Sequence, residues 1–201
     1  MNDLTISIQD QLPKESIKMI GNQLGATEAQ TALAIETINA VVIALMAQKV
    51  SVVQASGSML KVLDRNKDGN YGDDLKAFAL QISEGNIDTE EGKEIVEEIF
   101  SEHKQDVLKL ITAASGVATN TAYTLLQAIA PIVLNKIALE QQKRNWTVKE
   151  LGNQLADVTK SSTTEISKLV VHLFDKNGDG KISDDILKMA KNIFQNLKKR
   201  V

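Results

Sequence analysis

The stretch Ile38-Asn39-Ala40-Val41-Val42-Ile43 continues into Ala44-Leu45-Met46, and eight of these nine residues are apolar. A second stretch of the same character, Ile129-Ala130-Pro131-Ile132-Val133-Leu134, lies 91 residues further on. Helices that are apolar nearly all round belong in the middle of a bundle. The two stretches therefore predict central helices over about 28–48 and 120–142. Pro131 within the second predicts a kink or a restart near Ala130.

The composition favours a helical protein with an aliphatic core. Apolar residues make up 43% of the 201 residues, but aromatic residues make up only 3%. Ala, Leu, Lys, Gln and Glu are frequent and there are two prolines, which favours helix. The absence of cysteine excludes disulfides, thiolate zinc sites and thiol nucleophiles. The net charge is −3, and no basic stripe of the kind that binds nucleic acid is present.

The chain reads as two related halves, 1–88 and 89–201, whose cores are either separate or shared. In each half a short helix ends at a glycine, over 14–24 before Gly25 and over 102–115 before Gly116. A long apolar helix follows, then a helix that enters an acidic segment and a helix that leaves it. With a further helix over about 90–100, these elements predict an all-α bundle of about ten helices built from two helical repeats.

Local signals support several of the helix ends. Thr27 with Gln30 marks the start of the first long helix. The second half has about twenty extra residues near 142–161, where Thr147 and Glu150 form a capping box at the start of one more helix.

Two acidic segments, 64–74 and 175–185, share the pattern D-x-N-x-D-G-x-x-x-D-D. Calcium takes six to eight oxygen ligands at about 2.3–2.6 Å, and alternate side chains of such a loop converge on one point. Glycine at the sixth position allows the sharp turn that directs the next carbonyl inward. The predicted ligands of the first segment are Asp64, Asn66, Asp68, the Asn70 carbonyl and Asp73 or Asp74; those of the second are Asp175, Asn177, Asp179, the Lys181 carbonyl and Asp184 or Asp185.

Both segments depart from the EF-hand at the same place. The twelfth position, where an EF-hand has a bidentate Glu, is Leu75 in the first segment and Ile186 in the second. A shorter loop that closes on the paired aspartates is the expected form. The alternative is a plain turn, in which Asp73 or Asp184 caps a helix. Carboxylates about 5 Å apart repel by roughly 3 kcal/mol at an effective dielectric near 20, which favours a bound cation. Calcium is expected rather than magnesium, which prefers a rigid octahedron with retained waters.

Several further segments resemble the YidB-like bacterial family, a domain of unknown function. They are 98–107, 113–116 and 125–133, together with the acidic segment 175–185. The resemblance covers most of 90–197 and, more faintly, 14–82. It implies an all-helical fold with no established activity, and it supplies no catalytic residues. This chain departs from that pattern in its two units, in the Asn at the third position of each acidic segment and in its twenty-residue insert.

The sequence predicts a calcium-binding protein rather than an enzyme. Neither His103 nor His172 has a partner that suggests a catalytic triad or a zinc pair. Calcium is expected to be structural. Two alternatives stay open: a calcium-responsive module for protein–protein interaction, and a scaffold whose loops are mostly unoccupied.

The remaining expectations concern partners and location. Calcium ions are the expected ligands. A protein partner or self-association is a further possibility, and no nucleic-acid partner is expected. The longest uninterrupted apolar run, Ala40 to Ala47, is too short to cross a bilayer, so no transmembrane segment is expected. The N-terminus has no basic region followed by an apolar stretch, which predicts a cytoplasmic protein.

Overall fold

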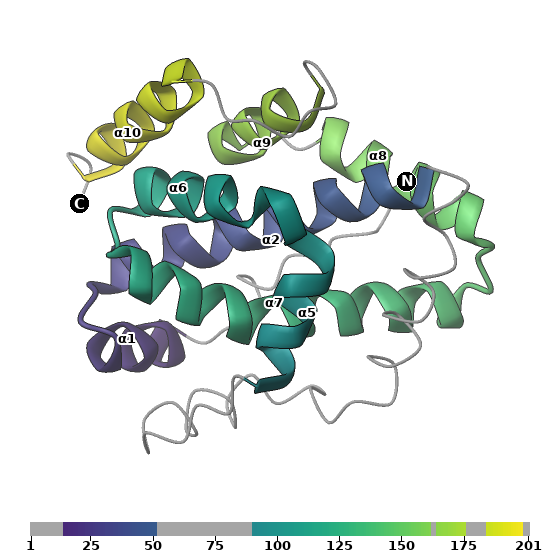
Figure 1. Ribbon diagram of the computed structural model, residues 1–201, viewed down its shortest axis with the longest axis horizontal. Helices are drawn as coiled ribbons and strands as arrows, with labels where there is room; N and C mark the ends of the chain where they lie inside the picture. Colours follow the sequence, from purple (N-terminus) through teal and green to yellow (C-terminus); the bar gives the residue numbers. More distant parts are fainter. Residues whose placement is uncertain (1–13, 52–89, 162–163, 176–183, 199–201) are drawn as a thin grey trace.

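In the computed structural model of the protein, every regular element of the described residues is a helix. The structure describes residues 14–51, 90–161, 164–175 and 184–198. Two long helices, α2 and α7, start at the same end and run side by side through the middle, and shorter helices surround them (Figure 1). The elements are α1 (Lys14–Gln23), α2 (Glu28–Ser51), α5 (Glu90–Phe100), the 3₁₀ turn η2 (Ser101–His103), α6 (Lys104–Ser115), α7 (Thr119–Lys143), α8 (Val148–Ser161), α9 (Glu165–Asp175) and α10 (Asp184–Lys198).

The all-α prediction is confirmed, but the count of about ten helices is not. The described residues contain eight α-helices. The two helices expected on either side of the first acidic segment fall on residues outside the described ranges. The bounds of both long helices agree with the sequence prediction to within three residues.

The core confirms the central position of the two long helices. One cluster of buried apolar side chains includes residues of α1, α2 and all the helices from α5 to α10. Ile38 on α2 and Ile129 on α7 have no exposed surface. Because α2 and α7 are in contact and covered on several sides, almost every position in their middle turns is buried, as their unbroken apolar sequences require.

Both predicted helix-start signals form reciprocal hydrogen bonds. The Thr27 N–H donates to Gln30 Oε1 (3.0 Å), and the Gln30 N–H donates to Thr27 Oγ1 (3.2 Å). At the start of α8, the Thr147 N–H donates to Glu150 Oε2 (2.8 Å), and the Glu150 N–H donates to Thr147 Oγ1 (3.3 Å). Each pair satisfies two backbone N–H groups that have no acceptor within the helix.

Two glycine corners connect the short helices to the long ones and lie against each other. Gly25 has φ = 68° and Gly116 has φ = 71°, a conformation that glycine adopts without the steric cost paid by other residues. Gln30 Nε2 donates a hydrogen bond to the Gly116 carbonyl (2.8 Å), and Thr121 Oγ1 donates one to the Leu24 carbonyl (3.0 Å). Each long helix therefore satisfies a free carbonyl at the end of the other half's short helix.

α5 and α7 cross closely at Gln127, four residues before Pro131. α7 continues through Pro131 without interruption, so the alternative of a restart near Ala130 is wrong. Proline has no N–H, so the carbonyl of Gln127, four residues earlier, loses its usual helical donor. Gly92 of α5 packs on this carbonyl: a Cβ added at Gly92 would lie 2.7 Å from the Gln127 carbonyl carbon and closer still to its oxygen. Only glycine allows the two backbones to approach this closely.

The insert of the second half forms α8, which packs on α2 of the first half. Leu151 and Leu155 of α8 have no exposed surface. Between them, Gly152 faces Val50, whose Cγ1 would lie 3.0 Å from an added Cβ. The extra residues thus cover the end of α2 and belong to the core.

Within the described ranges, two helices have the length and composition of a membrane span. They comprise Glu28–Val50 and Thr119–Lys143, and 61% and 78% of their most apolar windows are buried inside the protein. These windows are longer than the run from Ala40 to Ala47 because they also contain scattered polar residues. Burial of this extent is equally typical of core helices, so length and composition are weak evidence for a span.

Candidate functional site

The second acidic segment is bracketed by two helices. α9 ends on Asp175 and α10 begins on Asp184, as expected for a helix that enters the segment and one that leaves it. Asp185 lies in the first turn of α10. The other three predicted ligands, Asn177, Asp179 and Lys181, lie outside the described residues. The structure therefore places the backbone at both ends of this segment.

The bracketing helices are fixed by their packing. Ile166, Leu169 and Val170 of α9, which follow helical spacing in the sequence, are all buried. α10 packs mainly on α6 and to a lesser extent on α9. Its Ala190 is buried, whereas the neighbouring Met189 is 49% exposed.

The first acidic segment lies wholly outside the described residues. This holds for all of its predicted ligands: Asp64, Asn66, Asp68, Asn70, Asp73 and Asp74. In the part of the chain that the structure does describe, no three His, Asp or Glu side chains converge in a way that could hold a metal ion.

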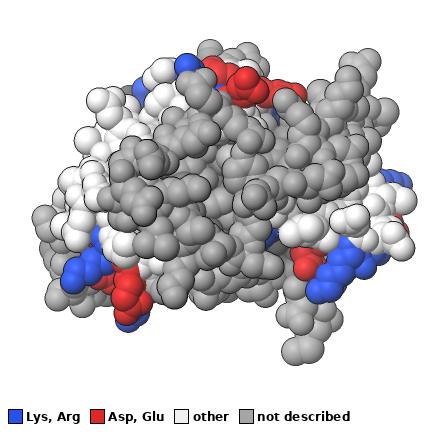
Figure 2. Space-filling model, turned by 90° about the horizontal axis from the view of Figure 1, so that it is seen from below, with Lys and Arg blue, Asp and Glu red and all other residues white. Residues whose placement is uncertain are grey.

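Charged side chains of both signs lie together on the surface. On the face seen in Figure 2, the described Lys and Arg side chains stand beside Asp and Glu side chains. The ion pairs among the described residues include those of Arg144 with Glu140 (2.8 Å) and of Lys168 with Glu165 (2.9 Å). Such exposed pairs are each worth less than about 1 kcal/mol.

Glu36 is a charged residue within the apolar helix α2. Its carboxyl group lies beside the start of α9. The Thr164 hydroxyl, which precedes α9 and accepts the Ser167 N–H (3.1 Å), also hydrogen-bonds the Glu36 carboxyl group. Burial raises the pKa of Glu36 above its ordinary value, and the hydrogen bond from Thr164 offsets part of this rise. A proton on Glu36 therefore favours the folded state.

Replacing Glu36 with glutamine should remove a pH dependence of stability. As pH rises from the ordinary pKa of a Glu side chain to the raised pKa in the folded protein, the unfolded chain loses its proton first, so stability falls. We expect the Glu36→Gln variant to lack this fall and to be more stable than the parent at pH 7. Urea unfolding between pH 4 and 7 measures it.

The control for this prediction is Thr164→Val, which keeps the carboxyl group but removes its hydrogen bond. The fall in stability with pH should then be larger than in the parent. If stability depended on pH in the same way in the parent and in the Glu36→Gln variant, the raised pKa of Glu36 would be contradicted.

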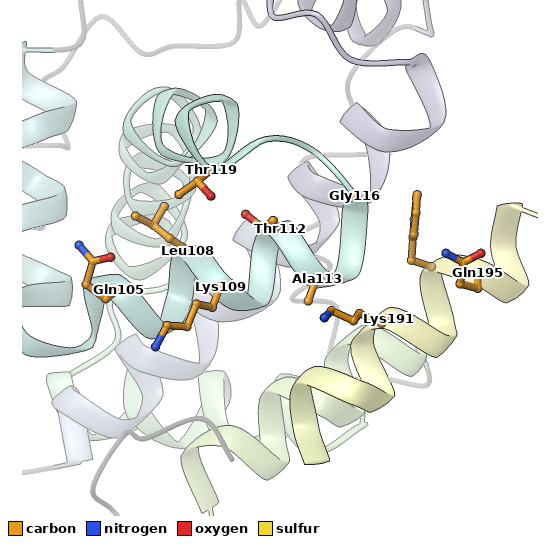
Figure 3. A pocket seen from close by; sticks show the side chains of 10 residues that line it. Gln105, Leu108, Lys109, Thr112, Ala113, Gly116, Thr119, Lys191 and Gln195 are labelled. Atoms are coloured by element: carbon orange, nitrogen blue, oxygen red, sulfur yellow. The ribbon is translucent and has the colours of Figure 1, made fainter. Parts of the chain in front are cut away.

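A groove of about 450 Å³ lies between α6, α10 and the start of α7 (Figure 3). α6 contributes a stripe of residues at helical spacing, and most of the lining surface is apolar although six of the ten lining residues are polar. The residues that line it are Gln105, Leu108, Lys109, Thr112, Ala113, Gly116, Thr119, Lys191, Phe194 and Gln195.

The ring of Phe194 lines the groove and lies directly over Gly116. A Cβ added at Gly116 would lie 2.7 Å from Phe194 Cε1 and closer still to Cζ. The groove was not predicted from the sequence. The available signal was the mixed polar and apolar stripe of α6 at three- and four-residue spacing.

One comparison with known proteins gives a match. A family model described as a bacterial protein of unknown function (DUF937) matches residues 7–140. No curated protein and no solved structure matches the chain.

Proposed function

This chain belongs to the DUF937 family of bacterial proteins of unknown function, and on that premise we propose that it is a calcium-binding helical protein without catalytic activity. Calcium would bind in the two acidic segments, 64–74 and 175–185, and stabilise the helices on either side. We also propose that the chain is one of the YidB-like proteins.

The observation that carries the proposal is the position of α9 and α10. α9 ends on Asp175, the first predicted ligand, and α10 starts on Asp184, the earlier of the two closing aspartates. The intervening residues include Asn177 and Asp179, whose side-chain oxygens suit calcium. A helix, an oxygen-rich segment and a second helix in this order favour a calcium corner over a plain turn.

A second part of the proposal is that the two halves are repeats of one unit. α7 begins 91 residues after α2, and the glycine corners before them are separated by the same number. Gln30 and Thr121, also 91 residues apart, each donate a hydrogen bond to the opposite corner. Such a reciprocal arrangement supports a two-fold relation between the halves, each of which ends in one acidic segment.

Two alternatives concern what calcium does. In the first, the protein is a calcium-responsive module that exposes apolar surface to a protein partner or to another copy of itself. In the second, it is a scaffold whose segments are mostly unoccupied. The buried faces of α9 and the extensive packing of α10 on α6 favour the structural role, because both helices are already part of the core. We expect no nucleic-acid partner, no transmembrane segment and a cytoplasmic location.

Calcium should raise the thermal stability of the protein, and substitution of the second segment should reduce this gain. At a calcium concentration one hundred times the Kd, one site adds about 2.7 kcal/mol to the free energy of unfolding. We expect the double variant Asp175→Ala and Asp179→Ala to lose the contribution of its segment. Melting curves of the parent and of the double variant, recorded in calcium and in chelator, measure the stabilisation by calcium.

The matched control is Asp157→Ala, which removes an exposed carboxylate from α8. This variant should keep the full calcium effect. A double variant whose calcium titration equals that of the parent would overturn the second site. Small-angle scattering and hydrogen exchange then separate the roles: an unchanged shape supports structural calcium, whereas an expanded shape with less protection supports the responsive module.

A further inference from the structure

We propose that the groove between α6 and α10 binds a small amphipathic organic anion of the medium-chain carboxylate type. The apolar chain would lie against Leu108, Ala113 and Phe194, and the carboxylate would lie beside Lys191. None of these residues belongs to the predicted calcium segments, so the site is separate from the proposed calcium function.

The size and the walls of the groove suit such a ligand. Small-molecule sites in proteins typically have volumes of roughly 300–1,000 Å³ and are mostly apolar with a few polar groups. The groove, at about 450 Å³, lies within this range. Leu108 and Ala113 are less than one-tenth exposed and form a fixed floor, while the ring of Phe194 lies over Gly116. Polar groups lie at the edges, on Gln105 and Gln195.

The charge of the lining favours an anion. Among the described residues, the lining includes two lysines and no Asp or Glu, although the whole chain has a net charge of −3. Lys109 forms an ion pair with Asp106 (3.0 Å), which lies outside the lining, so Lys191 provides most of the uncompensated charge among the described lining residues. Figure 3 shows Lys191 reaching from α10 toward Ala113 on α6.

The start of α7 adds to this positive potential. Thr119, its first residue, lines the groove, and the first turn of this 25-residue helix has no acidic residue. Its N-cap residue, Ala118, makes no side-chain hydrogen bond to the helix. The positive end of the helix dipole therefore faces the groove without a carboxylate of its own first turn to offset it.

The test is a titration of the full chain with octanoate and, separately, with 1-octanol, followed by calorimetry and by amide chemical shifts. We expect octanoate to bind more tightly than 1-octanol, with shifts concentrated on α6, α10 and the start of α7. Lys191→Gln should weaken octanoate about fivefold and leave 1-octanol nearly unchanged. The control Lys188→Gln removes the same charge from α10 outside the groove lining and should have little effect.

A second variant, Ala113→Leu, tests the apolar part of the groove. The larger side chain fills the floor and should abolish binding of both compounds, with thermal melting used to verify that the variant is folded. Equal binding of octanoate and 1-octanol would overturn the preference for an anion. Chemical-shift changes outside the groove would overturn the site itself. So would the absence of octanoate binding at concentrations up to about 10 mM.

Discussion

The Gly92→Ala variant should be less stable than the parent by about 3 kcal/mol or more, because its new methyl group meets backbone atoms. The added Cβ would lie 2.7 Å from the Gln127 carbonyl carbon and closer still to the oxygen. These atoms belong to the rigid backbone of α7, so they have no rotamer by which to move away. α5 must therefore separate from α7, and the packing of Ile95 and Ile99 on the core is lost with it. Urea unfolding measures the loss.

The control for this effect is Gly25→Ala. Gly25 has φ = 68°, but apart from its chain neighbours no described residue has an atom within 4 Å of an added Cβ. Alanine there should cost about 1 kcal/mol, the price of a left-handed conformation alone. Equal losses at Gly25 and Gly92 would show that backbone conformation, rather than the approach of α5 to α7, explains the effect at Gly92.

The features that the sequence predicted well are those set by local chemistry. The long helices follow from continuous apolar stretches such as 38–46, and the helix starts follow from Thr27 with Gln30 and Thr147 with Glu150. Hydrogen bonds within one turn depend on residues that are close together in the sequence, and so does burial on every side of a helix. Both can therefore be recognised from the local pattern of residue types.

The features that the sequence did not predict depend on contacts between distant segments. Nothing near Gly92 indicates that it packs on Gln127, and nothing in the insert indicates that α8 covers α2. The groove likewise needs α10 to lie against α6. Of the candidate calcium ligands, only Asp175, Asp184 and Asp185 lie within the described residues, so the arrangement of the others stays a prediction.

Truncation of one buried side chain in either half should destabilise the whole chain. Ile38 on α2 and Ile129 on α7 are fully buried in the same cluster. We expect Ile38→Ala and Ile129→Ala each to cost about 3 kcal/mol, because each removes apolar contacts and leaves a cavity. Leu139→Ala, at a position that is 41% exposed, serves as the control and should cost much less.

The same two variants decide whether the halves share one core. Trp146 lies in the second half, where its ring packs beside Arg144 at 5.1 Å, so its fluorescence reports on that half, whereas far-UV circular dichroism reports on all helices. If the core is shared, Ile38→Ala shifts both unfolding transitions to the same lower denaturant concentration, as Ile129→Ala does. The shared core is expected because α8, which follows Trp146 directly, packs on α2. A fluorescence transition that stays in place in the Ile38→Ala variant would instead mean that the second half unfolds independently.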